Sequence, residues 1–583
     1  MPGHSFGPFR LEANGVLTRG TTPIPLSAPE LSVLRLLLTR PGRTIAAQRF
    51  LAACGNHHPM RAEELMDCIA GLRARLAPEQ CVETVGKRGY RLTPGSRDGG
   101  PASPPSPPKL AIAPFETGPG IPDYLGPAIA EQTFVRLTAI RPDFVSLLPL
   151  DSIFTLVRRG NAAIETGRKV HADLVLSGSL HSLPSQYRVR AQMTRPADGR
   201  QLWVEDLLIG RERLPHLDME MASRLAFRLA GADRSISAAS IERQDTASVD
   251  SEAYYGYLRA HHEWQTLQRH RMQDGLQALL QVVEADPTLL AARIDLANLC
   301  VAEALYGFMS PAVAAETARA AAKPIEKDDP RAEAILPALG WMSFHVDRDL
   351  STALRLLSLS AHLPHDPWTT RARVMLALSR HRFDEALDLL DAAIRIDPYS
   401  PWLQARRAWT LHLADRPKES LEQALNALAL FPDHEGAQMY SIIILAFHGR
   451  ASQAVAMAAD LAQRLPYFDL GTAAQAYALA CAGQTGEAHA ILERLQWLSR
   501  ERYVLNSFTP AVYVALGDNE SALRELRLSA EARCPWFFQT LADPRLKPLA
   551  GEKVFQMMLE QLAAFEEDAA AEESFHEERV FQE

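Results

Sequence analysis

The chain has 583 residues, of which 47% are hydrophobic and 22% charged, so it is too long for one hydrophobic core, and a collagen-like or wholly disordered protein is excluded. Its net charge of −9 argues against binding nucleic acid along its whole length, but residues 1–95 hold 12 Lys and Arg against 7 Asp and Glu. A region of net charge +5 on a body of net charge −14 is typical of one DNA-facing domain, although so modest a surplus also arises by chance.

The first 95 residues alternate short strands and helices. Residues 5–26 alternate apolar and polar positions and predict short antiparallel strands. Ser27 and Glu30 have the spacing of a capping box, in which each side chain accepts a hydrogen bond from the other residue's amide. We therefore expect a helix over 28–39, and the next apolar pattern predicts a second helix over 46–53.

A third helix and a basic hairpin follow. The segment Arg61–Leu76 predicts a helix that carries four apolar residues on one face: Leu65, Ile69, Leu72 and Leu76. The segment Cys81–Leu92 (CVETVGKRGYRL) predicts two strands around a glycine-bounded turn with Lys87 and Arg88 at its tip. A helix followed by such a hairpin is the winged helix-turn-helix arrangement, with the helix in the major groove and the wing on the neighbouring backbone.

Residues 5–93 resemble the C-terminal DNA-binding domain of the OmpR/PhoB family. Four segments carry the resemblance: Leu26–Glu30, Pro41–Arg43, Ile69–Leu76 and Glu83–Arg91. The wing is most similar to that of CadC-, ToxR- and HilA-like regulators, in which this domain stands first in the chain. The resemblance implies promoter DNA as a partner, and it implies that the loop Gly55–Pro59 lies where the family can contact RNA polymerase.

The middle of the predicted recognition helix departs from the family, which has Arg, Lys and His there. This chain has small residues at Cys68, Ala70, Gly71 and Ala74, and acidic residues near the helix start at Glu63, Glu64 and Asp67. Small residues allow close approach to the bases, and an acid can accept from a cytosine amino group; the simpler interpretation, which we favour, is that the acids complement the helix dipole. The candidate DNA contacts are Arg61, Arg73, Arg75, Lys87, Arg88, Tyr90 and Arg91.

Two further regions precede the repeats. Residues 96–108 are rich in proline and predict an extended linker. Residues 109–232 mix strands and helices in a small α/β domain, with strands expected near 110–115, 144–150, 174–181, 187–194 and 199–205, and helices over 127–139 and 214–229. This domain resembles the TolB-like amino-terminal domain, which brings no catalytic residues with it, through Ala111–Phe115, Ala172–Ser179 and Leu202–Glu205.

Residues 250–560 form an alanine-rich pattern of helices. Prolines recur 31 to 43 residues apart between Pro287 and Pro466, and the clearest unit is Pro367–Pro398, with two helices and a turn. A period near ~34 with two helices per unit resembles the tetratricopeptide repeat (TPR), which implies a superhelix with a concave face for a protein partner or ligand. Residues 561–583 predict an acidic tail, either a frayed helix or disordered.

The expected fold class is multidomain α/β plus α: an N-terminal winged helix over 1–95, a small α/β domain and a C-terminal TPR α-solenoid. No catalytic, nucleotide-binding or Walker-type motif appears, and the histidine pairs at 57–58 and 261–262 have no third ligand nearby, so we expect no enzyme, cofactor or metal. The six cysteines form no CxxC pair, and no apolar run reaches the length of a membrane span. We expect a cytoplasmic protein with reduced thiols and no membrane contact.

Two functions fit this sequence best. The first is a bacterial transcriptional regulator, whose winged helix binds promoter DNA while the TolB-like and TPR regions sense a ligand or bind a protein. The second is a TPR scaffold whose winged helix serves as a protein-interaction module; the small and acidic residues of the recognition helix favour it and the basic wing opposes it. A third, an accessory of a signalling enzyme, rests only on the domains that accompany TolB-like domains elsewhere.

Overall fold

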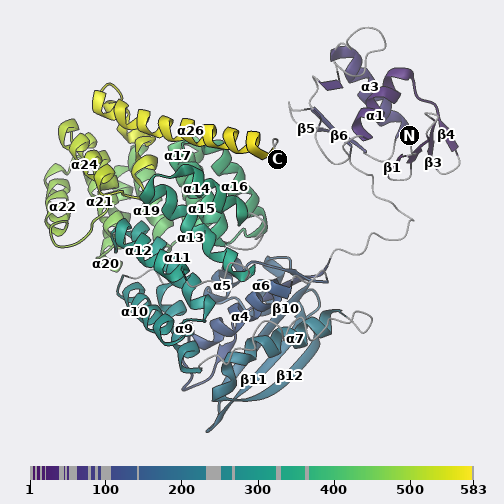
Figure 1. Ribbon diagram of the computed structural model, residues 1–583, viewed down its shortest axis with the longest axis horizontal. Coiled ribbons are helices and arrows are strands. Elements are labelled where there is room, and N and C mark those ends of the chain that lie inside the picture. Colours follow the sequence, from purple (N-terminus) through teal and green to yellow (C-terminus); the bar gives the residue numbers. More distant parts are fainter. Residues whose placement is uncertain are drawn as a thin grey trace. The chain divides into compact units, whose positions relative to one another are not determined.

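The computed structural model describes residues 4–6, 9–12, 16–19, 22–38, 45, 49–50, 62–76, 81–85, 89–92, 107–140, 144–230, 251–265, 269–323, 330–360 and 367–580. The chain divides into two compact units, Met1–Ser106 and Pro107–Glu583, each with its own hydrophobic core (Figure 1). The tip of the predicted wing and most of the predicted second helix lie outside the described residues.

The first unit has an antiparallel sheet, helices and a hairpin. The sheet has the order β1-β2-β3-β4. The elements are β1 (His4–Phe6), β2 (Phe9–Leu11), β3 (Leu17–Arg19), β4 (Thr22–Ile24), α1 (Ala28–Leu38), α3 (Ala62–Arg75), β5 (Val82–Val85) and β6 (Gly89–Leu92). Helices α1 and α3 bury their leucine faces against the sheet residues Phe9 and Leu17. The strands, the two helix faces and the hairpin expected from the sequence are confirmed.

The second unit begins with a mixed sheet. Its elements are β7 (Lys109–Ile112), β8 (Glu116–Thr117), α4 (Leu125–Ile140), β9 (Ser146–Leu147), α5 (Leu150–Arg158), α6 (Ala163–Lys169), β10 (Leu174–Ser182), β11 (Gln186–Arg195), β12 (Arg200–Gly210), the short 3-10 helix η1 (Arg211–His216) and α7 (Leu217–Ala230). The strand order is β12-β11-β10-β7-β9, with β8 beside β10; β7 pairs in parallel with β9 and β10, and the long strands β10, β11 and β12 are antiparallel. The expected α/β architecture is present.

Strand β7 is buried on both faces, which explains its unbroken apolar sequence. Leu110 and Ile112 belong to the core that includes α4 and α7, whereas Ala111 and Ala113 pack with residues of α5 on the opposite face. The prediction of a strand over 144–150 was too long, because the strand has only two residues and α5 begins at Leu150. The apolar residues of the strand are followed directly by Leu150, Ile153 and Phe154, which have helical spacing. The sequence therefore shows one apolar run, with no visible boundary between strand and helix.

Helices fill the rest of the second unit. They are α9 (Ser251–Trp264), α10 (Arg269–Ala285), α11 (Leu290–Tyr306), α12 (Pro311–Ala322), η2 (Pro330–Ile335), α13 (Leu336–Met342), the π-helix η3 (Ser343–Asp347), α14 (Leu350–Leu359), α15 (Pro367–Ser379), α16 (Phe383–Ile396), α17 (Pro401–Leu413), α18 (Pro417–Leu430), α19 (Glu435–Phe447), α20 (Ala451–Arg464), α21 (Asp469–Cys481), α22 (Thr485–Leu498), η4 (Asn506–Phe508), α23 (Thr509–Ala515), α24 (Asn519–Glu531), α25 (Phe537–Leu541), η5 (Pro544–Leu549) and α26 (Lys553–Val580). In five consecutive pairs, the second helices begin at intervals of 34 residues, at Phe383, Pro417, Ala451, Thr485 and Asn519. The helical-repeat prediction is confirmed.

The turn inside each pair repeats with the same period. In five consecutive helix pairs, the middle residue of the turn between the two helices has a left-handed backbone: His381, Asp415, Gly449, Gly483 and Gly517. At Gly483 the φ angle is 77°, and the next amide, that of Gln484, donates to the Leu479 carbonyl at 2.9 Å. This 6→1 bond is the Schellman motif, which terminates the first helix and turns the chain into the second.

We expect Gly483→Ala to lower the free energy of unfolding of the repeat region by about 1–2 kcal/mol, because a Cβ disfavours the left-handed backbone. Nothing lies within 4 Å of a Cβ built at residue 483, so no clash contributes. Gly486 is a matched control, since it lies in α22 and a Cβ there also meets open space. Gly486→Ala should stabilise by up to about 1 kcal/mol. Urea unfolding followed by circular dichroism measures both; effects of the same sign would contradict this account.

The α/β region and the repeats share one core. Residues of α4, α9 and α11 belong to the same buried cluster, and the Gln132 side chain donates to the Tyr257 hydroxyl at 3.3 Å. Near α5, the Ser152 hydroxyl accepts from the Tyr399 amide at 2.9 Å and contacts the Asp397 carboxylate of the repeats. The described residues of the α/β segment and of the helical repeats therefore belong to one compact unit.

The C-terminal segment is helical, one of the two forms that the sequence predicted, and residues at its start pack on the repeats. Helix α26 runs to Val580 across the repeats (Figure 1), and Leu562 is buried. Glu566 accepts from Arg380 and from Arg382, each at 2.7 Å. The acid-rich sequence does not predict this contact, because the partner arginines lie more than 180 residues earlier in the chain. Across the part of the chain that the structure describes, no helix is both long and apolar enough to cross a membrane.

Candidate functional site

Helix α3, the predicted recognition helix, is fixed by one apolar face. Leu65, Ile69, Leu72 and Leu76 are all at least 98% buried, as the helical spacing predicted. Arg73 and Arg75 are exposed at the end of the same helix. The helix therefore presents two of the candidate DNA contacts to solvent at its C-terminal end.

Arg75 also has partners inside the first unit. Its Nε donates to Glu30 Oε1 at 3.0 Å, and its Nη1 donates to the Pro25 carbonyl at 2.7 Å. Glu30 is 6% exposed and closes the predicted capping box, accepting from the Ser27 amide at 2.7 Å while its own amide donates to Ser27 Oγ at 3.3 Å. Burial opposes ionisation, but the hydrogen bonds from Ser27 and Arg75 outweigh it and hold the pKa of the Glu30 carboxyl below its ordinary value. Arg75 thus ties α3 to the start of α1.

This network accounts for a small residue in the recognition helix. A Cβ at Gly71 would overlap Glu30 Oε1, the oxygen that Arg75 holds. The sequence offered close approach to DNA as the reason for small residues here. For Gly71 the structure supplies a reason within the fold: the residue leaves room for the buried Glu30 carboxylate.

We expect Gly71→Ala to lower the free energy of unfolding of the first unit by about 1–2 kcal/mol, because the methyl group displaces a carboxylate held by two partners. An ordinary helical glycine would give the opposite sign, a gain of about 1 kcal/mol. The control is the same substitution in a Glu30→Ala background, where the obstacle is gone and the gain should return. Urea unfolding of residues 1–106 measures the cycle, and additive effects would contradict the proposed contact.

The hairpin packs beside α3. The Arg73 Nε donates to the Val82 carbonyl at 2.9 Å, which joins the recognition helix to the first wing strand. Tyr90 exchanges two backbone hydrogen bonds with Ile45, at 2.9 and 3.0 Å, and its ring meets that of Phe50 edge-on with centroids 5.9 Å apart. Tyr90 therefore contributes to the fold, and the Arg91 side chain is half-buried.

The other candidate contacts, Arg61, Lys87 and Arg88, lie outside the described residues, as does the loop Gly55–Pro59. Of the seven positions proposed from the sequence, the structure places four. It brings Arg73 and Arg75 together on α3, and Tyr90 and Arg91 together on β6.

A second candidate site lies on the first helices of the repeats, where arginines alternate with aromatic rings. The Arg371 guanidinium lies 5.1 Å from the Trp368 ring and 5.3 Å from the Trp402 ring. Arg406 is 5% exposed and lies 5.0 Å from the Trp536 ring; its Nε and Nη1 have no hydrogen-bond partner among the described residues. A cavity of about 90 Å³ opens beside these side chains.

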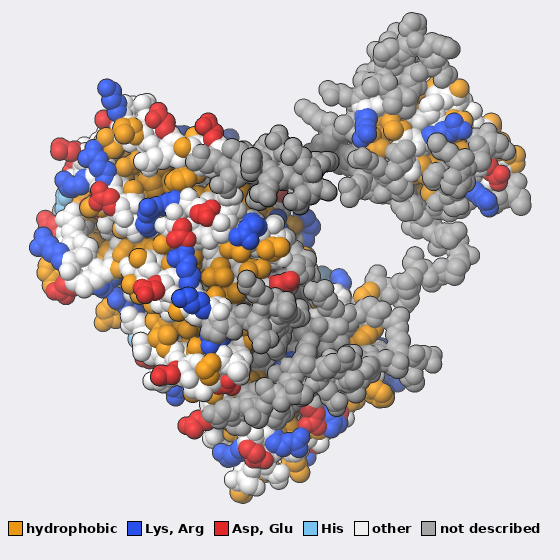
Figure 2. All heavy atoms as spheres, viewed as in Figure 1, with side chains coloured by type: hydrophobic (Ala, Val, Ile, Leu, Met, Phe, Trp, Pro, Cys, Tyr) orange, Lys and Arg blue, Asp and Glu red, His pale blue; other side chains and the backbone are white. Residues whose placement is uncertain are grey.

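Tryptophans on helical repeats are explained most simply by core packing, and no sequence motif singles out the arginines beside them. Trp264, Trp341, Trp409 and Trp536 are indeed buried, but Trp368 and Trp402 are only partly buried and line the cavity. Their spacing of 34 residues equals the repeat period, and this spacing was the available signal. On the visible face of the second unit, basic and acidic side chains are interspersed among the residues described there (Figure 2). The described residues of this face therefore offer no patch of one sign of the kind that attracts DNA.

One histidine of the pair on α9, His261, is explained by ion pairing. His261 lies 2.9 Å from Glu131 of α4 and also contacts Asp295 of α11. Both acids raise the pKa of His261 well above its ordinary value, although burial alone would lower it. In the described parts of the chain, no cluster of three or more His, Cys, Asp or Glu residues could hold a metal ion.

Residues 21–92 match the family model described as "Transcriptional regulatory protein, C terminal", the winged helix of OmpR/PhoB type. No curated protein matches the chain. Similar solved structures include a tetratricopeptide repeat protein from Parabacteroides merdae, which is 15% identical with a TM-score of 0.29 over 43% of this chain and 92% of that one. The APC/C hetero-tetramer Cut9-Hcn1 is 14% identical with a TM-score of 0.39, over 61% of this chain and 66% of that one.

A third similar structure is the PelC dodecamer from Paraburkholderia phytofirmans, 16% identical with a TM-score of 0.15, covering 20% of this chain and 83% of that one. At these scores the repeat character of the second unit rests on its own helix pairs. The chain thus combines a DNA-binding domain of the transcriptional-regulator kind with a TPR-like helical region.

Proposed function

We propose that this protein is a transcriptional regulator of the CadC/ToxR/HilA-like kind, whose winged helix binds promoter DNA from the cytoplasm. The observation that carries the proposal is the family match over residues 21–92, on a unit whose helix α3 presents Arg73 and Arg75 to solvent. Lys87 and Arg88 would contact the phosphate backbone from the wing. The loop Gly55–Pro59 would contact RNA polymerase. The proposal gives the chain no catalytic role.

The second unit would supply the regulation. Its α/β part, which we propose to be TolB-like, shares a core with the repeats, so an event on the repeats can be transmitted to it through that core. The partly exposed arginine–aromatic surface around Trp368 and Trp402 would bind a protein partner, because aromatic residues and arginine are the side chains enriched where partners bind tightly.

The test is binding of the full chain to its own promoter region and to random duplexes, measured by fluorescence anisotropy at several salt concentrations. We expect affinity to fall steeply and linearly on a log–log plot as salt rises, with tighter binding to the promoter. No salt-dependent binding to any duplex would overturn the regulator proposal.

That failure would favour the scaffold alternative, in which the winged helix binds protein. One observation supports this alternative: Arg75, a candidate DNA contact, is paired with the buried Glu30. A pull-down with the isolated first unit would then be expected to capture proteins of the same complex that the second unit binds. Failure to capture them would count against the scaffold.

A further inference from the structure

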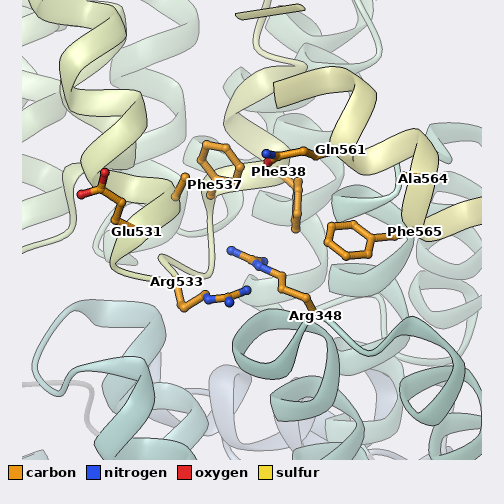
Figure 3. Close-up of a pocket in the computed structure, with 9 residues that line it drawn as sticks. Arg348, Glu531, Arg533, Phe537, Phe538, Gln561, Ala564 and Phe565 are labelled. Atoms are coloured by element: carbon orange, nitrogen blue, oxygen red, sulfur yellow. The ribbon is translucent and has the colours of Figure 1, made fainter. Parts of the chain in front are cut away.

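A pocket of about 590 Å³ opens at the C-terminal end of the repeats, away from the arginine–aromatic surface described above. Four segments form it: the turn before α14, the end of α24, helix α25 and helix α26. Figure 3 shows Arg348 and Arg533 reaching toward each other on one side, with Phe538, Phe565 and Gln561 on the other. Pockets of this volume hold small organic molecules.

Both arginines occupy strained backbone. Arg348 has a φ of 68° and Arg533 a φ of 53°, a region that favours glycine. Of the five left-handed positions in the turns inside the helix pairs, three hold glycine and two hold His381 and Asp415. Two arginines with left-handed backbone on one pocket point to a role for their side chains, since strained residues concentrate at functional sites.

The pocket concentrates positive charge without a matching acid. Within the described residues, neither guanidinium has a hydrogen bond or ion pair to an acid, and Arg348 Nη1 is buried without a partner. Glu531 also lines the pocket, but Figure 3 shows its carboxylate turned away from the two guanidinium groups. Burial and the nearby charge of Arg533 lower the pKa of Arg348 to about 10. An anion placed between the two groups would relieve both the desolvation and the repulsion.

The remaining walls are aromatic. The Arg348 guanidinium lies 4.4 Å from the Phe538 ring, and the rings of Phe538 and Phe565 meet edge-on with centroids 5.9 Å apart. Arginine stacked on an aromatic ring keeps its in-plane N–H donors available, which suits two-point recognition of a carboxylate or phosphate. The phenyl groups would cover an apolar body attached to that anion.

We propose that this pocket binds a small organic anion, whose carboxylate or phosphate is held by Arg348 and Arg533 and whose aromatic body packs on Phe538 and Phe565. Gln561 of α26 would donate a further hydrogen bond. Because the pocket is closed on one side by α26, the bound anion would fix this helix to the repeats. The inference does not depend on DNA binding, so either proposal can fail without the other.

The test is calorimetric titration of the full chain with four probes: phenyl phosphate, phenylacetate, the neutral phenylacetamide and inorganic phosphate. We expect the two aromatic anions to bind in about the millimolar-to-micromolar range that probes of this size reach. The neutral amide and the ring-free phosphate should bind roughly tenfold more weakly or worse. The tighter of the two aromatic anions identifies the headgroup. No saturable binding of either, or equal binding of phenylacetamide, overturns the proposal.

The variants Arg348→Gly and Arg533→Gly remove each guanidinium at a backbone position that glycine accepts. We expect each to weaken the aromatic anions roughly tenfold or more, while the melting temperature of Arg533→Gly stays at or above that of the wild type. Arg500→Gln is the matched control, because Arg500 is exposed and lies outside the pocket, and it should bind as the wild type does. Unchanged binding in both glycine variants would overturn the proposal.

Discussion

Replacing Asp543 by asparagine is expected to lower the free energy of unfolding of the second unit by about 3–5 kcal/mol, because it leaves a buried arginine without its counter-charge. Asp543 is 3% exposed and Arg545 is 6% exposed. The carboxylate accepts from Arg545 Nη2 at 2.6 Å and from the Arg545 amide at 3.0 Å, and it lies 3.2 Å from His412 Nε2 of α17. Urea unfolding followed by tryptophan fluorescence measures the effect.

The control is Asp415→Asn. Asp415 pairs with Lys547 at 2.7 Å, but both side chains are more than half exposed. Solvent screens such a pair, so we expect a change within about 0.5 kcal/mol. A loss at residue 543 no larger than the loss at residue 415 would show that the buried network does not stabilise the array.

The same network gives a pH dependence of definite sign. Burial alone would raise the pKa of the Asp543 carboxyl, but Arg545 and His412 hold it well below its ordinary value. A lowered carboxyl pKa contributes stability above the unfolded value of about 4, and that contribution is lost as the pH falls toward the folded value. The stability difference between wild type and Asp543→Asn should therefore shrink in acid.

The features that were predicted correctly are those determined by residues close together in the sequence. The capping box at Ser27 and Glu30, the leucine face of α3 and the paired hairpin strands all depend on residues within one or two turns of each other. The 34-residue repeat was also visible, because each turn must reverse the chain in the same way. Such features could be read without knowing which segments meet in space.

The features that sequence reasoning missed depend on distant partners. Arg75 meets Glu30 across 45 residues, and Glu566 meets Arg380 across 186. Taken alone, Arg75 suggests DNA contact, and the acidic C-terminal sequence suggests a solvated tail. Only the packing of α1 on α3, and of α26 on the repeats, gives these charges a partner. Three of the four candidate DNA contacts that the structure describes, Arg73, Arg75 and Tyr90, thus have a second role within the fold.

The double substitution Lys87→Ala and Arg88→Ala is expected to weaken DNA binding by roughly 10–100-fold at about 0.1 M salt, and to flatten the plot of log K against log salt by about two units. The reason is the loss of the two phosphate contacts proposed above, from residues that the sequence predicts to lie at a hairpin tip between Gly86 and Gly89. Because the sequence predicts that both side chains project into solvent, stability should change by no more than about 0.5 kcal/mol. Anisotropy titrations of the full chain on promoter and random duplexes measure both affinity and slope.

The matched control removes the same charge elsewhere in the first unit, by Arg10→Ala and Arg35→Ala, two exposed arginines on β2 and α1. If the wing binds phosphate directly, the control should keep a slope within about half a unit of the wild type, since condensed counterions respond to contacts and not to net charge. Equal slopes for the two double variants would mean that the basic region acts only through its total charge, without direct phosphate contacts.

The variant Arg73→Ala tests whether Arg73 reads a base. If Arg73 reads a base, the variant should lose about 1–3 kcal/mol on the promoter and little on random DNA; if its bond to the Val82 carbonyl is its only role, both duplexes should weaken alike.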